Sequence, residues 1–259
     1  MVTLLCTVRE CRAPLTRETA RVVCERGHSF DIARSGYINL LQPQDRRARN
    51  PGDSADVVAA RRRFLEHYAV PLDLSHVSAP TALLDAGCGE GHYLGVVRAQ
   101  FGCEAHGVDI SVPAIDAAAR AHRDCAFVVA NADRFLPYAD GSFDLVMSIN
   151  ARLNPCEFRR VLRDGGTLLV SILAADDLRE LRGGPEQDHV ERTISLFASQ
   201  FTLVGHDTVR RTVHLDRGGI RDALLSSYRG IRDVPDEERD VTLSRDVLTF
   251  VAIRSDSDY

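Results

Sequence analysis

Short apolar runs alternate with helical patterns from Thr81 onward. Segments whose apolar residues recur at helical spacing fall between runs that have the length of buried strands. The alternation predicts an α/β fold with a mostly parallel sheet, as in Rossmann-like domains, and helices on its faces. Two later strand patterns suit an antiparallel pair that ends such a sheet. The expected parallel strands are 82–85, 105–109, 126–130, 143–148 and 167–172, and the expected antiparallel pair is 201–212 with 247–254.

The first 80 residues follow a different pattern. Residues 43–56 are polar and rich in Arg, Asn, Pro and Gly, which is typical of a linker or an ordered loop. Ser54 or Asp53 can then cap a helix whose apolar residues recur at helical spacing as far as Leu65. We therefore expect three parts: a small module at 1–42, a linker and helix at 43–80, and the α/β domain at 81–259.

Composition narrows the class of protein. Hydrophobic residues make up 44% and charged residues 27% of the chain, and no run of about 18 apolar residues offers a membrane-spanning helix. The N-terminus lacks the basic start and long apolar stretch of a secretory signal, which favours a cytoplasmic location. Seven cysteines in that setting argue against a disulfide framework.

Charge is distributed unevenly along the chain. Residues 1–70 hold 12 arginines and 8 acidic residues, whereas the formal net charge of the whole chain is −5. A basic N-terminal segment on an acidic body is compatible with contacts to phosphates, such as those of a nucleic acid, although a solvated surface explains the same arginines. The candidates for phosphate contacts are Arg46, Arg47 and Arg49 in the linker.

Three of the seven cysteines and one histidine fall within the first 28 residues. They form two close pairs, Cys6 with Cys11 and Cys24 with His28. Zinc prefers four tetrahedral thiolate or imidazole ligands, and each pair can sit on one tight turn. A segment of about 40 residues cannot bury a sufficient core by itself. We therefore predict that these four residues bind one structural Zn²⁺; the alternative is a chance cluster of surface cysteines.

A glycine-rich turn follows the first predicted strand of the α/β domain. Glycines there can take positive φ and let the backbone approach a ligand closely. The spacing G-x-G-x-G after an acid departs from the G-x-G-x-x-G turn of dinucleotide-binding proteins, so a dinucleotide fits less well. The expected cofactor contacts in this turn are Asp85, Gly87, Cys88, Gly89, Glu90 and Gly91.

Polar residues follow the next two predicted strands. Asp109 ends the second strand, where a carboxylate can accept hydrogen bonds from both ribose hydroxyls of a bound nucleoside. Asn131, Ala132 and Asp133 follow the third strand. Any one of these acids could instead cap a helix. Their order along the chain nevertheless predicts one cofactor site, with Ile110 beside Asp109 among its contacts.

These ordered motifs resemble those of class I S-adenosylmethionine-dependent methyltransferases. Taken with the N-terminal module, the chain resembles the bacterial 23S ribosomal RNA (guanine-N1)-methyltransferases, including the branch that confers resistance to macrolide antibiotics. The most specific portion is 24–41, and the segments 52–54, 60–68, 154–162, 165–170 and 188–189 also resemble the family.

The resemblance implies an enzyme that transfers a methyl group from S-adenosylmethionine to N1 of a guanine in 23S ribosomal RNA. It implies that the zinc module recognises an RNA hairpin, that Tyr68 borders the cofactor and that Asp133 approaches the adenine amine. If guanine N1 is the acceptor, its proton must leave, and His189 is the candidate general base. The expected cofactors are S-adenosylmethionine and a structural Zn²⁺, and the expected partner is ribosomal RNA.

Two departures from the family pattern fall where the target base should lie. Asn150-Ala151-Arg152 replaces an aromatic-Ala-Pro segment, and a segment that includes Tyr228 replaces one that contains a Trp. We expect Asn150, Arg152 and Tyr228 to shape the acceptor pocket, with Tyr228 in place of the missing Trp. Two alternatives stay open: a small-molecule methyltransferase derived from the family, and a non-catalytic RNA-binding protein. The sequence determines neither the target nucleotide nor the oligomeric state, a homodimer included.

Overall fold

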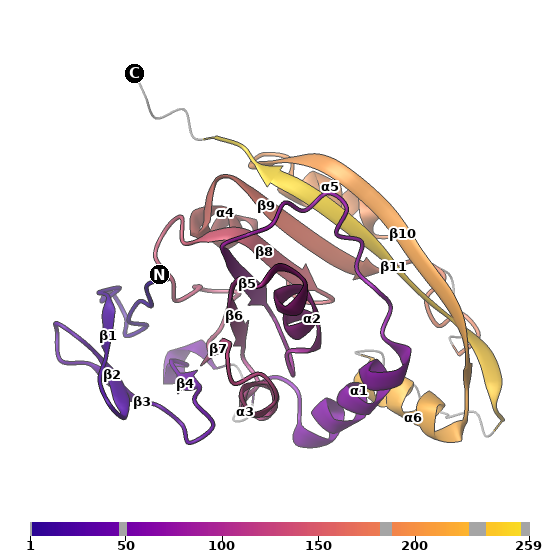
Figure 1. The fold of residues 1–259 in the computed structure, drawn as a ribbon, viewed down its shortest axis with the longest axis horizontal. Coiled ribbons are helices and arrows are strands. Elements are labelled where there is room, and N and C mark those ends of the chain that lie inside the picture. The colour runs from indigo at the N-terminus through magenta and orange to yellow at the C-terminus, as the bar shows by residue number, and fades with distance from the viewer. Residues whose placement is uncertain (1, 47–50, 182–187, 228–236, 255–259) are drawn as a thin grey trace.

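The computed structural model describes residues 2–46, 51–181, 188–227 and 237–254 (Figure 1). An eight-stranded sheet runs through the molecule, and a small three-stranded sheet lies at the N-terminal end. No helix within the described residues is long and apolar enough to cross a membrane.

The large sheet has the strand order β10-β11-β9-β8-β5-β6-β7-β4. Its strands pair in parallel from β9 across to β4, and β11 pairs antiparallel with both β9 and β10. The mostly parallel sheet and the antiparallel C-terminal pair are therefore confirmed. The strands are β4 (Ile38–Asn39), β5 (Ala82–Ala86), β6 (Glu104–Asp109), β7 (Ala126–Val129), β8 (Phe143–Ile149), β9 (Leu162–Leu173), β10 (Phe201–Leu215) and β11 (Arg239–Ala252).

β11 begins eight residues before the predicted strand 247–254. Its first half alternates apolar residues with Thr242, Ser244 and Asp246, a pattern that suggests an exposed face. All three are buried, because side chains of neighbouring segments supply hydrogen-bond partners for them. The sequence pattern therefore missed the first half of β11, where the polar face is covered by other polar groups.

Helices cover both faces of the large sheet. Adjacent strand residues point to opposite faces, so Leu83 packs with α2 and α3, while Leu84 packs with α4 and α5. Parallel strands that are buried on both faces read as continuous apolar runs, as β5 does. The four helices are α2 (His92–Phe101), α3 (Val112–Ala121), α4 (Pro155–Val161) and α5 (Val190–Phe197).

Helix α1 (Ala55–Tyr68) follows the linker, in which η1 (Pro43–Asp45) forms one short turn. Ser54 caps α1 by accepting a hydrogen bond from the Val57 N–H, which resolves the sequence alternative between Ser54 and Asp53. α1 packs against α6 (Arg217–Ser226), which lies between β10 and β11 in the chain, beside the long antiparallel pair that these two strands form. These two helices therefore lie next to each other, although about 150 residues separate them in the chain.

The N-terminal module contains β1 (Leu15–Arg17), β2 (Arg21–Cys24) and β3 (Ser29–Asp31), paired antiparallel. Its last strand, β4, leaves this sheet and pairs in parallel with β7 at the edge of the large sheet. Leu40 extends the connection by donating its N–H to the Val129 carbonyl at 3.0 Å. The module and the α/β domain thus share a sheet, and the domain boundary at residue 42 stays a prediction.

Candidate functional site

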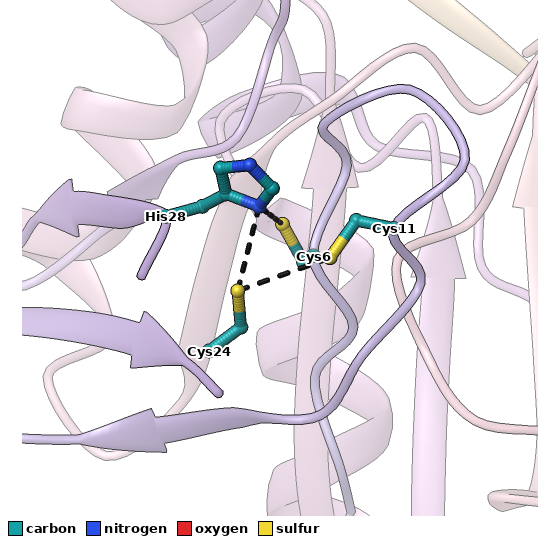
Figure 2. Close-up of side chains that lie close together, drawn as sticks. All are labelled: Cys6, Cys11, Cys24 and His28. Atoms are coloured by element: carbon teal, nitrogen blue, oxygen red, sulfur yellow. Dashed lines mark hydrogen bonds between the residues drawn. The ribbon is translucent and has the colours of Figure 1, made fainter. Parts of the chain in front are cut away.

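The four predicted metal ligands lie together in the N-terminal module (Figure 2). Their ligand atoms are all within 4.8 Å of one another, and the three cysteines are buried. The Cys6 and Cys24 sulfurs are each 3.4 Å from His28 Nδ1, and the Cys11 and Cys24 sulfurs are 3.8 Å apart. The structure therefore brings together both pairs that the sequence suggested.

These separations match the edges of a tetrahedron around zinc. Zn–S bonds of about 2.3 Å and Zn–N bonds of about 2.0–2.1 Å place two sulfurs about 3.8 Å apart and a sulfur and a nitrogen about 3.6 Å apart. Burial raises the pKa of the Cys6 thiol to about 12, so a metal cation is needed to hold its thiolate form. Three thiols and one imidazole at these distances fit a structural Zn²⁺.

Two turns position the ligands. In the second turn, Cys24 donates its N–H to the His28 carbonyl, and Gly27 takes a φ of 82° between them. The first turn holds four residues between its cysteines rather than the usual two, and it places Glu10 in the left-handed region with a φ of 62°. The longer turn therefore still brings Cys11 back to the cluster.

The glycine-rich turn between β5 and α2 forms one wall of a pocket. Gly87 and Gly89 have φ values of 90° and 55°, which favour glycine. A Cβ at Gly87 would lie 2.4 Å from the Ala151 Cβ, so no larger residue fits there. The turn therefore exposes backbone at close range, which is what the approach of a nucleoside cofactor requires.

Asp109 lies beside the glycine turn at the carboxyl end of β6 and lines the same pocket. One carboxylate oxygen accepts the Gly89 N–H at 3.0 Å, and the other accepts the Ser111 N–H at 2.8 Å. Burial raises the pKa of Asp109, and these two N–H groups partly offset the rise. Each oxygen keeps a further lone pair for a ribose hydroxyl.

Asp85, one residue before the end of β5, is a buried acid with 2% of its surface exposed. Its Oδ1 has no hydrogen-bond partner among the described residues. Burial, together with the charges of Asp109 and Glu90, raises the pKa of Asp85 to about 8. A buried carboxyl group without a partner is costly, and a cationic ligand group, such as the amine of an amino acid, would stabilise it.

The pocket gathers most of the predicted cofactor contacts. Tyr68 from α1 and Asn150 after β8 line it. Asn150 has a φ of 51°, and its side-chain oxygen is buried without a partner among the residues that the structure describes. The unpartnered Asp85 and Asn150 oxygens, the glycine cradle and the Asp109 carboxylate fit S-adenosylmethionine. The predicted contacts that line the pocket are Tyr68, Asp85, Gly87, Cys88, Gly89, Glu90 and Asp109.

The other predicted cofactor contacts lie outside this lining. Asn131 donates its side-chain amide to the Asp45 carbonyl of the linker at 2.9 Å, and its side-chain oxygen accepts the Asp133 N–H at 3.1 Å. Asp133 is exposed and pairs with Arg152 at 3.3 Å. Their roles in cofactor binding stay predictions, as do those of Ile110, Ala132 and the α2 cap Gly91.

The predicted catalytic and acceptor residues are only partly brought together. His189 precedes α5 and does not line the pocket, whereas His92 of α2 does. Arg152 is exposed and is not part of the lining, while Asn150 is. Tyr228 of the acceptor prediction and Arg47 and Arg49 of the phosphate prediction lie outside the described residues.

Several lining residues were not predicted from the sequence. Phe64 and Leu65 come from α1, Ser226 and Ser227 from the end of α6, and Arg245 from the middle of β11. The α1 and α6 residues carry no sequence signal for a cofactor site. Arg245 carried none either, because the alternation of apolar and polar residues around it suggests an exposed face, and only the structure shows that residues 241–250 are buried.

Two family models match the chain. Residues 83–166 match a family described as a methyltransferase domain, and residues 5–49 match one described as the RlmA N-terminal region. The first covers the glycine turn and Asp109, and the second covers all four predicted metal ligands. The glycine turn with Asp109 and the four predicted metal ligands therefore each lie in a segment that matches a family model.

Three relatives match between three quarters and nine tenths of the chain. The 23S rRNA (guanine(748)-N(1))-methyltransferase of Streptomyces fradiae is 37% identical over 88% of this chain and 86% of that protein. A relative from Micromonospora griseorubida is 36% identical over 75% of this chain and 74% of its own. One from Bacillus subtilis (strain 168) is 32% identical over 75% and 73%. Both are provisionally named 23S rRNA (guanine-N(1)-)-methyltransferases.

Proposed function

The chain belongs to the family of 23S rRNA (guanine-N1)-methyltransferases, and we propose that it transfers a methyl group from S-adenosylmethionine to N1 of a guanine in 23S ribosomal RNA. The observation that carries the proposal is the pocket of Gly87, Gly89 and Asp109 in one chain with a four-ligand metal module. A methyltransferase pocket alone would fit many acceptors, and the module favours RNA.

A groove between the module and the edge of the large sheet supports an RNA partner. Arg9, Arg12 and Arg134 line it together with Phe135. Arg12 lies over the Phe135 ring, with its guanidinium carbon 4.7 Å from the ring centroid. Arg160 also lies over this half-buried ring, at 4.9 Å, so the ring holds the two guanidinium groups in place rather than offering a free face to a base. Arginines supply contacts to phosphates. The groove therefore fits the backbone of an RNA hairpin, and Arg46 of the linker is exposed nearby in the chain.

The chemistry requires alignment more than covalent participation by the protein. S-adenosylmethionine supplies an electrophilic methyl group on a sulfonium centre. Asp109 orients the ribose, the glycine turn admits the cofactor at close range, and Asp85 faces its amine. Tyr68 and Phe64 line the pocket with rings that would displace water around a bound cofactor. These groups hold the donor in place for an in-line displacement.

The proton on guanine N1 must leave during methyl transfer. His92 is the histidine that lines the pocket, and burial lowers its pKa. Its ring is therefore neutral near pH 7 and able to accept a proton. Asn150 lines the pocket with a side-chain oxygen that has no partner among the described residues, and it is our candidate contact to the acceptor base.

We also propose a cytoplasmic location, where a bacterial enzyme meets ribosomal RNA. A role in resistance to ribosome-targeting antibiotics is part of the same proposal.

Transfer of tritiated methyl from S-adenosylmethionine into purified 23S rRNA tests the proposal. N1 lies on the Watson–Crick edge of guanine, so reverse transcription should stop beside the modified base. The Asp109→Ala variant should lose most of the incorporated label. A protein that binds S-adenosylmethionine but leaves 23S rRNA unlabelled would overturn the RNA proposal and favour a small-molecule acceptor.

A further inference from the structure

Arg245 occupies an unusual position for a charged residue. It lies in β11, whose neighbours β9 and β10 pair with it on both sides, and it is opposite Leu173 at the end of β9. Only 5% of its surface is exposed. A guanidinium cannot lose its proton in a protein, so the chain holds a full positive charge inside the sheet layer.

The guanidinium lacks polar partners for two of its nitrogen atoms. Nε and Nη1 are buried without a hydrogen-bond partner among the described residues. The guanidinium carbon lies 4.8 Å from the centre of the Tyr93 ring, a cation–π contact, and the Tyr93 hydroxyl also interacts with the guanidinium but carries no negative charge. The Tyr93 hydroxyl is itself directed to the Val70 carbonyl at 3.1 Å. A buried cation without an anionic partner destabilises the fold unless a ligand supplies the missing hydrogen-bond acceptors and negative charge.

Three nearby buried polar side chains of β11 differ from Arg245 in this respect. Thr242 donates to Glu180, Ser244 donates to Asp176, and Asp246 accepts from Thr208. They alternate with Arg245 along the strand and therefore point to the opposite face of the sheet. These three polar groups therefore have hydrogen-bond partners on that face, whereas the guanidinium on the other face lines the pocket.

Three of the four acids that share the pocket with Arg245 have other partners, and the charges that act on the fourth, Asp85, are those of Asp109 and Glu90 rather than that of Arg245. Glu90 pairs with Arg61 at 2.7 Å, Asp109 accepts from two backbone N–H groups, and Asp177 accepts the Ser244 N–H at 3.0 Å. An anion from outside the chain is therefore the remaining partner of suitable charge. The same pocket contains the unpartnered Asp85 oxygen, which calls for a cation. A ligand that carries both charges satisfies both residues.

We propose that Arg245 binds the α-carboxylate of the methionine part of S-adenosylmethionine. The inference rests on the proposed function and names one contact within it. Tyr93, on which the guanidinium stacks, is the second residue of α2, and α2 begins directly after the glycine turn. Arg245 therefore lies on the cofactor side of the pocket. An RNA phosphate is the competing anion, but phosphates of a folded RNA meet exposed arginines rather than one buried beside a helix.

Calorimetry with S-adenosylmethionine and its decarboxylated analogue tests the contact. Wild-type protein should bind the decarboxylated compound about 10- to 100-fold more weakly, as expected for charge-assisted hydrogen bonds. The Arg245→Met variant should lose a similar factor for S-adenosylmethionine and show little change for the analogue. Arg245→Lys, which keeps the charge without the planar fork, should fall between them.

Arg239→Met is the matched control. Arg239 begins the same strand and also has a buried Nε without a partner among the described residues, but it does not line the pocket. The affinities of the Arg239→Met protein for both compounds should equal those of the wild type.

Equal binding of the two compounds by the wild-type protein overturns the inference, even if Arg245→Met does not fold. A variant that keeps its affinity for S-adenosylmethionine but loses RNA binding assigns Arg245 to a phosphate and also overturns it. A wild-type protein that binds neither compound overturns the proposed function itself.

Discussion

Arg61 Nε donates to Glu90 Oε2 across 2.7 Å, so the helix that follows the linker is tied directly to the glycine turn. Arg61 also pairs with Asp53 of the linker. Burial alone would lower the pKa of Arg61, but the charges of Glu90 and Asp53 raise it above its ordinary value. The linker, α1 and the cofactor pocket thus share one charged network.

Arg61→Met should destabilise the protein and weaken cofactor binding. The substitution leaves the Glu90 carboxylate, whose side chain is 5% exposed, without its cation, at a cost of about 2–4 kcal/mol. Urea unfolding and calorimetry with S-adenosylmethionine measure the two effects. Arg63→Met is the control, because Arg63 lies on the same helix with a side chain 58% exposed and should change stability by less than about 1 kcal/mol. Equal effects of the two substitutions would contradict the role of the network.

Zinc should be present at about one ion per chain and should depend on all four predicted ligands. Cys11→Ser is the informative variant, because Cys11 ends the longer of the two turns. We expect it to lose the metal and to destabilise the module, since metal binding and folding are coupled in small sites. Metal analysis after gel filtration gives the stoichiometry. Cys156→Ser, at an exposed cysteine, should retain the zinc; loss of metal from both variants would argue against a specific site.

Asp85 should make the cofactor-free protein less stable as pH rises. Its pKa is about 8 in the folded chain and about 4 when unfolded, so the folded state favours the protonated acid. The stability that protonation supplies is complete below about pH 4 and is lost as pH rises towards about 8, by up to about 1.4 kcal/mol per pH unit. Asp85→Asn removes this dependence.

Urea unfolding between pH 5.5 and about 8.5 should therefore show a stability gap between Asp85→Asn and the wild type that widens with pH. The same substitution should weaken the binding of S-adenosylmethionine, because the amine loses its counter-charge. Parallel stability curves for the two proteins would show that Asp85 titrates near its ordinary pKa.

Asp109→Ala should weaken the binding of S-adenosylmethionine by about 1–3 kcal/mol through loss of the charge-assisted hydrogen bonds to ribose. Calorimetry measures the change. Asp124→Ala is the control, since Asp124 is an exposed acid outside the pocket that pairs with Arg98. A folded Asp109→Ala protein with wild-type affinity would remove Asp109 from the site.

RNA binding should depend on the arginines of the groove between the module and the sheet. Replacing Arg9 and Arg12 by Gln should weaken binding to a 23S rRNA hairpin and reduce the slope of log affinity against log salt by about one for each lost phosphate contact. Filter binding at several salt concentrations gives the slope. Arg221→Gln, at an exposed position on α6, should leave it unchanged, and an unaltered slope in the double variant would place the RNA elsewhere.

The sequence by itself determined the features that depend on local pattern and spacing. Apolar runs between helical segments located the parallel strands, and the residues from Asp85 to Gly91 identified the cofactor turn, because a glycine at positive φ leaves its mark in the sequence. Two close pairs of ligands predicted the metal cluster for a similar reason, since each pair belongs to one turn.

Only the tertiary structure decided which distant residues share the pocket. Arg245 reaches it because β11 inserts between β9 and β10, and Asn131 does not line it because the linker carbonyl of Asp45 takes its amide. β4 joins the large sheet through two residues, too short a run to show a strand pattern. Such contacts depend on strand order and register, which are set by burial across the whole chain. No pattern of residues at a fixed spacing in the sequence therefore predicts them.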